Sequence, residues 1–162
     1  MSESRFSVVH VRMRSERTFT DVQAAFERRL GRFDPDVYQS LAEGGDPAAV
    51  RARLEAMAGP SGFMLFGTSD HGALLRLVGQ ERKAVQYVIG NPLFAVEMTR
   101  HAIGAGLYAP LRVLIYEADD GKTCIEYDRP SSLFGQFGDE RVSPMAAALD
   151  QKLEALATAA MR

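Results

Sequence analysis

The chain has 162 residues, of which 46% are hydrophobic and 25% are charged, proportions typical of one globular domain and unlike those of disordered or fibrous proteins. Its 19 basic and 21 acidic residues give a formal net charge of −2, so it lacks the cationic excess typical of proteins that neutralise many phosphates, and we expect no nucleic-acid partner. The single cysteine, Cys124, excludes an internal disulfide and a zinc site built from several cysteines.

The N-terminal region predicts a strand followed by a helix. Apolar and polar residues alternate over residues 5–14, which is typical of a strand, and His10 shares one face of it with arginines that we interpret as surface or interface residues. Residues 18–31 predict an amphipathic helix, with Thr20 in a capping box at its start and Gly31 at its end.

Residues 34–60 predict helical material between the first helix and the next strand. The stretch "FDPDVYQSLAEGG" is typical of a short helix within a longer connection. An amphipathic helix follows, for which Asp46 is the expected cap and Pro47 the first residue, and which ends at Gly59-Pro60.

Four more strands are predicted after that segment. Residues 61–72, "SGFMLFGTSDHG", form an apolar run bounded by glycines, which indicates a strand buried on both faces. Residues 82–89 alternate and predict the next strand. Residues 110–128 predict two strands that turn at Asp120-Gly121, a dipeptide typical of hairpins.

A long amphipathic helix is predicted over residues 143–160. It should pack on the sheet through an apolar stripe made of Met145, Leu149, Leu153 and Leu156. Since no internal repeat or linker divides the sequence, we expect residues 1–162 to form a single α+β domain of the type β-α-β(4)-α with inserted helices, in which an antiparallel sheet of about five strands carries helices mainly on one face.

Several landmarks recur in a fixed order along the chain. They are Asp70-His71 at the end of a buried strand, Gly90-Asn91-Pro92, Pro110-Leu111-Arg112 at the start of a strand, an acidic-Gly hairpin, and the step Tyr127-Asp128-x-Pro130. This order resembles the family catalogued as domain of unknown function 302 (DUF302). The similarity covers residues 61–157, and the first strand and helix more loosely.

The resemblance implies a compact α+β fold of the TATA-binding-protein-like class and a homodimer. The name of that class describes an architecture and carries no inference of DNA binding. This chain departs from shorter members through the segment 34–60 and through Tyr108, where many members have an acidic residue. We carry over no catalytic residue from the family.

The stretch "YVIGNPLFAVEMTRH" contains most of the candidate site residues. Asn91 caps a predicted helix on which Glu97 and His101 are spaced i, i+4 and can therefore touch. A carboxylate that orients an imidazole favours general-base chemistry or metal ligation, whereas an ordinary solvated helix pair is the alternative. Phe94 and Met98 lie on the flank nearest His101, so this face is expected to border a mostly apolar pocket.

Three further residues complete the set of ligand-binding candidates. His71 lies where a predicted buried strand ends, although Asp70 could simply cap the segment that follows. Arg112 could bind a carboxylate or phosphate through its planar guanidinium. Tyr108 is included because a tyrosine can serve as an axial ligand of haem.

We weigh three hypotheses for the function. The first is a dimeric module that binds a small apolar or prosthetic ligand between the sheet and the helix of residues 91–103, with haem, ligated by His101, as the candidate that is easiest to test. The second is an enzyme that uses His71 or the Glu97/His101 pair as acid and base. The third is a structural or partner-binding domain in which these residues only stabilise turns.

The sequence gives no indication of a membrane protein. No apolar run approaches the roughly 20 residues that span a bilayer, and the first residues do not resemble a signal peptide. We therefore expect a cytoplasmic protein without a membrane partner.

Overall fold

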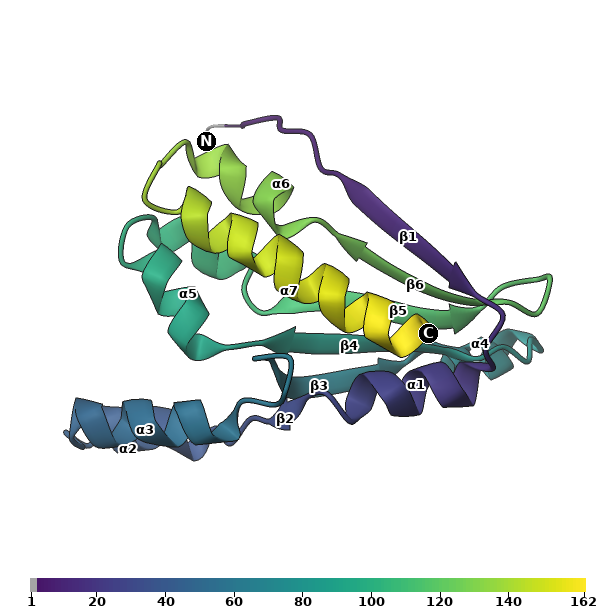
Figure 1. The fold of residues 1–162 in the computed structure, drawn as a ribbon, viewed down its shortest axis with the longest axis horizontal. Helices are drawn as coiled ribbons and strands as arrows, with labels where there is room; N and C mark the ends of the chain where they lie inside the picture. Colours follow the sequence, from purple (N-terminus) through teal and green to yellow (C-terminus); the bar gives the residue numbers. More distant parts are fainter. Residues whose placement is uncertain (1–2) are drawn as a thin grey trace.

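A mostly antiparallel sheet of six strands, in the order β1-β6-β5-β4-β3-β2, forms the centre of the computed structural model, which describes residues 3–162 (Figure 1). The strands are β1 (His10–Ser15), β2 (Gly31–Arg32), β3 (Met64–Asp70), β4 (Ala84–Gly90), β5 (Leu111–Glu117) and β6 (Thr123–Asp128). Only β2 runs parallel to its neighbour, β3, among these strands. The five strands expected from the sequence are present, and β2 is an addition.

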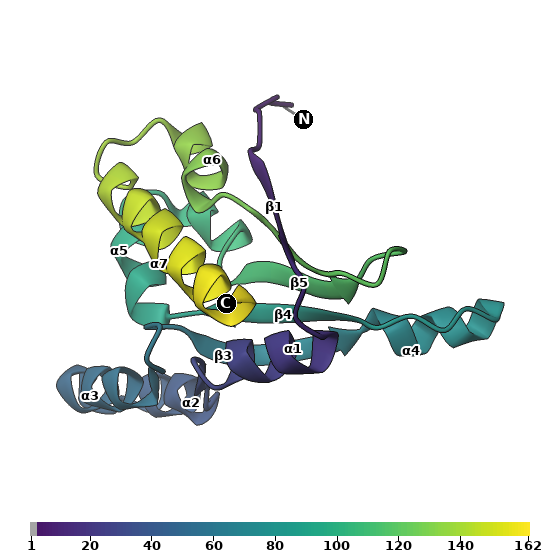
Figure 2. The same cartoon turned by 45° about the vertical axis from the view of Figure 1, so that its right-hand side comes forward.

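Seven α-helices and three short 3-10 helices lie within residues 3–162. They are α1 (Phe19–Glu27), α2 (Asp36–Ala42), α3 (Pro47–Met57), α4 (His71–Leu75), η1 (Arg76–Val78), α5 (Pro92–Thr99), η2 (Ile103–Leu107), α6 (Pro130–Phe134), η3 (Gly135–Phe137) and α7 (Ser143–Met161). In Figures 1 and 2, α1, α5 and α7 lie on the same side of the sheet. The expected single α+β domain is confirmed over this range; residues 1–2 lie outside the described part.

The main core lies between the sheet and the helices on its covered side, which include α1, α5 and α7. The last three residues of the predicted α7 stripe are buried: Leu153 is fully enclosed, and Leu149 and Leu156 are almost so. Met145 is partly buried against the same cluster. Because residues alternate between the two faces of a strand, the inward residues of β4, β5 and β6, such as Tyr87, complete this core from the sheet.

The opposite face of the sheet follows from the strand register. Arg12 of β1 lies opposite Glu126 of β6, which lies opposite Leu114 of β5, which in turn lies opposite Gln86 of β4. These four side chains point away from the helical layer, because their neighbours in each strand face the core. We call this surface the open face.

The hairpin between β5 and β6 turns where the sequence predicts it. Gly121 has φ of 78°, a conformation that side chains other than glycine rarely adopt, and its N–H donates to the carbonyl of Ala118 at 2.9 Å. The prediction from Asp120-Gly121 is therefore confirmed.

The boundaries of α1 differ from those expected. Its N-cap is Thr18, whose hydroxyl accepts from the N–H of Asp21, so Thr20 lies inside the helix and the predicted cap was wrong by two residues. The earlier start allows Phe19 to be buried. The helix ends at Glu27, and Gly31 belongs to β2, where its N–H donates to the carbonyl of Phe63.

The prediction that β3 is buried on both faces was also wrong. Met64 is buried, but the strand becomes exposed toward Ser69 and Asp70. Two features account for this: β2 covers only the first residues of β3, and the open face carries no helical layer. The apolar run therefore predicted the presence of the strand correctly, but not how far the strand is buried.

The segment 34–60 contains α2 and α3, as its sequence predicts. Asp46 caps α3 by accepting from the N–H groups of Ala48 and Ala49. The two helices share a small core of their own, made of Val37, Val50 and Leu54 with Phe33, Met57 and Leu93 packed against it. Figure 2 shows this pair beyond one end of the sheet and α4 beyond the other. That the segment is an insertion relative to shorter chains stays a prediction.

Candidate functional site

A cavity of about 70 Å³ lies at the start of α5, where β4 ends and β5 begins. Aromatic and aliphatic side chains provide most of its wall, which includes Phe63, Phe94, Met98, Leu111, Phe134 and Leu149. This volume is several times the roughly 10–15 Å³ that one water needs, and about half that of an engineered apolar cavity that binds benzene. Because the cavity is open on one side, it fits a small apolar group, including a ring that enters only in part.

Asn91 contributes to this wall, and its side-chain amide is already engaged in two hydrogen bonds with the backbone. Its side-chain oxygen accepts from the N–H of Leu93 at 2.9 Å, and its amide donates to the carbonyl of Gly62 at 2.9 Å. Asn91 caps α5 as predicted, and the same hydrogen bonds occupy both ends of its amide. Whatever enters the cavity beside it meets an apolar surface.

Glu97 and His101 do not form the pair that their spacing predicts. The helix α5 ends at Thr99, so the i, i+4 geometry of a continuous helix does not extend to His101. Instead Glu97 pairs with Arg100 at 3.6 Å, and Arg100 Nε donates to His101 Nε2 at 2.9 Å. Phe94 and Met98 line the cavity as expected, whereas the wall around them includes neither Glu97 nor His101.

The residues around the cavity do not fit a haem. Pockets for drug-sized ligands measure roughly 300–1,000 Å³, several times the roughly 70 Å³ of the cavity beside α5. His101, the expected axial ligand, lies outside the lining. Within residues 3–162, no group of three or more histidine, cysteine or acidic side chains is arranged to hold a metal ion.

Tyr108 and Arg112 lie together in a smaller hollow. It measures about 40 Å³ and is also lined by Asp128 and Leu133. The Tyr108 ring makes edge contacts with Phe6 at 6.0 Å and with a second phenylalanine of η3. Tyr108 is thus chiefly a packing residue, and Arg112 is exposed on the open face.

The helix α4, which begins at His71, lies at the opposite end of the sheet from α5 (Figure 1), so the two candidate histidines belong to different regions. His71 is the first residue of α4, and Asp70 caps this helix by accepting from the N–H of Ala73 at 2.8 Å. His71 itself lines a concavity on the open face, together with Gln86 and Tyr116. The structural role considered for Asp70 is confirmed.

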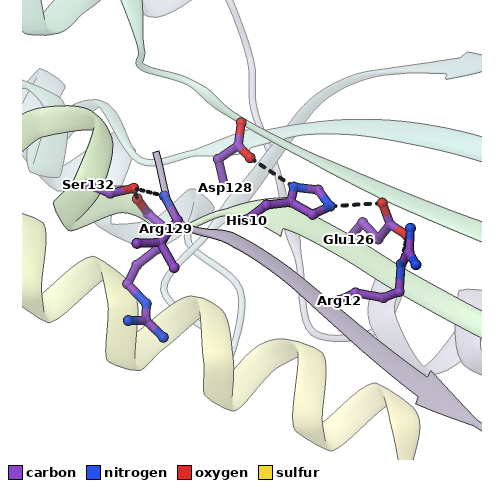
Figure 3. A network of polar contacts seen from close by, with 7 residues as sticks. His10, Arg12, Glu126, Asp128, Arg129 and Ser132 are labelled. Carbon is purple, nitrogen blue, oxygen red and sulfur yellow. Dashed lines mark hydrogen bonds and ion pairs between the residues drawn. The ribbon is translucent and has the colours of Figure 1, made fainter. Parts of the chain in front are cut away.

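A network of charged side chains on the open face joins β1 to β6 (Figure 3). His10 bridges two carboxylates, with Nδ1 at 3.0 Å from Asp128 and Nε2 at 2.9 Å from Glu126. Glu126 also accepts hydrogen bonds from Arg12 and from the hydroxyl of Tyr116. One carboxylate thus gathers three donors from two neighbouring strands, β1 and β5.

These contacts shift the ionisation of the groups concerned. Hydrogen bonds to Asp128 and then to Glu126 raise the pKa of His10 above its ordinary value of 6.5. Partial burial opposes the charge of Glu126, but its three donors together outweigh that effect and lower its pKa. Burial, aided by the hydrogen bond to Glu126, raises the pKa of Tyr116, which therefore stays protonated at neutral pH.

The bridge at His10 predicts a pH dependence of stability. A raised pKa in the folded state means that protonated His10 stabilises the fold fully below about pH 6.5, and that this contribution is lost as the pH rises through the folded pKa. We expect the free energy of unfolding to fall slightly over that range, because His10 is half exposed and solvent screens the bridge. Denaturant titrations at a series of pH values measure this change in the free energy of unfolding.

Two variants identify the group responsible. His10→Gln should remove most of this slope, whereas His101→Gln leaves the contacts between β1 and β6 intact and should keep it. Equal slopes in His10→Gln and the wild type would show that the bridge does not contribute to stability.

Reasoning from the sequence missed Tyr116 and Glu126. One signal could have found them: the hairpin at Asp120-Gly121 fixes the register of β5 and β6, and the alternation of strand residues then places both side chains on the same face. The partners of His10 could not be found in this way, because β1 is distant in sequence from β6 and no local signal gives its register.

Comparisons with known proteins show the family of the chain and a similar fold. The family model described as "Domain of unknown function DUF302" matches residues 39–160. The fold is similar to the crystal structure of an uncharacterized conserved protein DUF302 from Bacillus stearothermophilus, with a TM-score of 0.66 and 17% identity over 94% of this chain and 98% of that chain. A search of curated proteins returned no match. Within residues 3–162, no helix has the length and apolar character to cross a membrane.

Proposed function

This chain belongs to the DUF302 family, and we propose that it is a small-ligand binding protein whose ligand inserts an apolar group into the cavity beside α5. The observation that carries the proposal is the cavity itself, a space of about 70 Å³ lined mainly by aromatic and aliphatic side chains. Binding sites for small molecules are typically preformed and apolar in this way.

The chemistry of the wall defines the part of the ligand that enters. Asn91 uses its side-chain oxygen to cap α5 and one of its two amide N–H groups to hold Gly62, so most of its polar capacity is already engaged. Phe94 and Met98, one helical turn apart on α5, present a ring and a thioether that adapt to a hydrocarbon group. A short alkyl group or a single small ring suits this wall better than a polar one.

The cavity can be filled from α5 without changing its polar contacts. Ala95 lines the cavity, and the side chain of Ala95→Phe would occupy the space that the ligand needs. With benzene as the probe, we expect the wild type to show chemical-shift changes confined to residues of the cavity wall, and Ala95→Phe to lose at least about nine-tenths of the affinity. Nuclear magnetic resonance titration measures both.

A neighbouring residue of the same helix provides the control. Val96 is exposed, so Val96→Phe adds a ring on the solvent side of α5 and should leave benzene binding unchanged. If Ala95→Phe does not fold, the smaller change Ala95→Leu tests the same point. Benzene that bound equally to the wild type and to a folded Ala95 variant, or that did not bind the wild type, would refute the proposal.

We also propose that the protein is a homodimer, formed through the edge of β1. This strand stands at one end of the strand order, and the chain before it exposes Phe6, Val8 and Val9. Exposed strand edges are surfaces on which a second strand can pair, and a two-fold axis would allow two β1 edges to do so.

Light scattering tests the proposed dimer. We expect twice the chain mass at micromolar concentrations, and a lower mass for the double variant Val8→Lys, Val9→Lys, because lysines directly beside the edge of β1 oppose strand pairing there. The idea is refuted if the wild type keeps the mass of one chain at millimolar concentration.

A further inference from the structure

A second concavity, of about 380 Å³, lies on the open face and shares no lining residue with the cavity beside α5. It extends across the open face from β1, which carries Arg12, to α4. Its wall includes Arg12, His71, Arg82, Gln86, Leu114 and Tyr116. The volume falls in the range of roughly 300–1,000 Å³ typical of pockets for small organic molecules. The proposed binding of an apolar group beside α5 makes no use of it.

The floor of this concavity is apolar. Leu114 occupies its centre, between Glu126 and Gln86 in the row of paired residues, and is only half buried. Ala84 lies two residues further along β4, on the same face as Gln86, and Leu75 of α4 forms the facing wall. A ligand with an apolar body would cover hydrocarbon surface here that water otherwise contacts.

Arg12 presents its charge toward this floor. The side chain of Arg12 is 60% exposed whereas that of its partner, Glu126, is 13% exposed, so the cation is the accessible member of the pair. Its Nε donates to Glu126, and no other hydrogen bond of its guanidinium is found in the part of the chain that the structure describes. The two terminal NH₂ groups remain available to bind the two oxygens of a carboxylate side by side.

The rest of the wall adds more positive than negative charge. Arg82 and Lys83 line it with Glu117, which pairs with Lys83 at 3.2 Å. The partner of Arg82 is Asp119, which lies outside the lining. With Arg12 and Glu126 included, three cations and two carboxylates line the concavity, and one of those carboxylates is sheltered.

We propose that this concavity binds a small organic anion whose apolar body lies on Leu114 and whose carboxylate is held by Arg12. Glu126 has a positioning role: it accepts from Arg12, His10 and Tyr116 and thereby fixes the guanidinium against the sheet. A guanidinium held in place in this way loses less freedom on binding than a mobile one. His71 and Gln86 add polar groups on the other side of the floor.

Naphthalene-2-carboxylate has both required parts and serves as the probe. Isothermal titration should show binding to the wild type that falls at least tenfold in Arg12→Gln, and naphthalene-2-carboxamide, which lacks the charge, should bind at least tenfold more weakly than the acid. Leu114→Asp, which places a carboxylate on the floor, should also abolish binding of the acid.

Matched variants distinguish binding at this site from a general attraction of the anion to the protein surface. Arg112→Gln removes an equal charge from an exposed position of β5 outside the lining, and should leave the affinity unchanged. Ala95→Phe fills the cavity beside α5 and should also bind the acid normally, so this site and the proposed function can fail independently. Circular dichroism establishes that each variant is folded. Equal affinities of Arg12→Gln and Arg112→Gln, equal affinities for the acid and the amide, or no binding by the wild type would overturn the proposal.

Discussion

Replacing Leu153 by alanine is expected to lower the free energy of unfolding by roughly 2–5 kcal/mol, the range found when buried leucines are truncated. Leu153 is fully buried on α7, in the middle of a helix that packs against α1 and the sheet. The loss combines the transfer of three carbon atoms out of the core with the cavity that they leave, because a closely packed interior relaxes only partly. Equilibrium denaturation with urea measures the change.

An exposed leucine provides the comparison. Leu77 in η1 is 85% exposed, so Leu77→Ala removes the same atoms without leaving a cavity and should change the free energy of unfolding by less than about 0.5 kcal/mol. If Leu153→Ala cost as little as Leu77→Ala, α7 would not pack on the sheet as described.

Local signals account for the parts of the fold that the sequence predicts well. The stripe of α7, the Asn91-Pro92 start of α5, the Asp46 cap of α3 and the Asp120-Gly121 hairpin each depend on residues within a few turns of chain. Periodicity and capping act over that same range, so a single sequence contains the information.

The features that were missed depend on contacts between distant segments. The strand β2 has only two residues. It forms through pairing with β3 and through the hydrogen bond from the N–H of Gly31 to the carbonyl of Phe63, a contact between segments about 30 residues apart. Residues 61–72 resemble a doubly buried strand because their composition does not reveal that one face of the sheet lacks a covering layer. Exposure of β3 is a property of the assembled sheet and not of its own sequence.

The candidate site shows the same difference between features that depend on local signals and features that do not. Phe94, Met98 and His101 were expected on one face bordering an apolar pocket; Phe94 and Met98 line the cavity, whereas His101 does not. Glu97 and His101 were paired on the assumption that this helix continues, whereas it ends at Thr99. A spacing of i, i+4 predicts contact only where both residues are helical.

The open face shows what the strand register adds. No spacing in the sequence relates His10 to Glu126, yet the antiparallel pairing of β1 with β6 brings Nε2 of His10 to 2.9 Å from Oε2 of Glu126. The same register brings Arg12 beside Glu126 and aligns Leu114 next to it. A binding surface composed of single residues from several strands has no local motif, so it becomes visible only with the sheet assembled.

Gly31→Ala is the second substitution for which we expect a large effect, a loss of roughly 3 kcal/mol or more in the free energy of unfolding. A Cβ atom on Gly31 would overlap the carbonyl oxygen of Met57 and lie 2.6 Å from the nitrogen of Gly59. Both obstacles are backbone atoms, which cannot rotate away as a side chain can. Relief therefore requires the chain after α3 to separate from β2, which would also weaken the hydrogen bonds that Gly31 and Gly59 both donate to the carbonyl of Phe63.

Gly135 is the matched control for this substitution, because a Cβ atom there meets nothing within 4 Å and its φ is −61°. Gly135→Ala should leave the fold unchanged or stabilise it by about 0.4–1 kcal/mol, since alanine restricts the unfolded chain without straining the folded one. Urea denaturation of both variants compares a glycine required by close backbone approach with one that is not. A Gly31→Ala protein as stable as Gly135→Ala would mean that the chain at residues 57–59 does not lie against β2, and that the junction between the sheet and the α2–α3 pair is built differently.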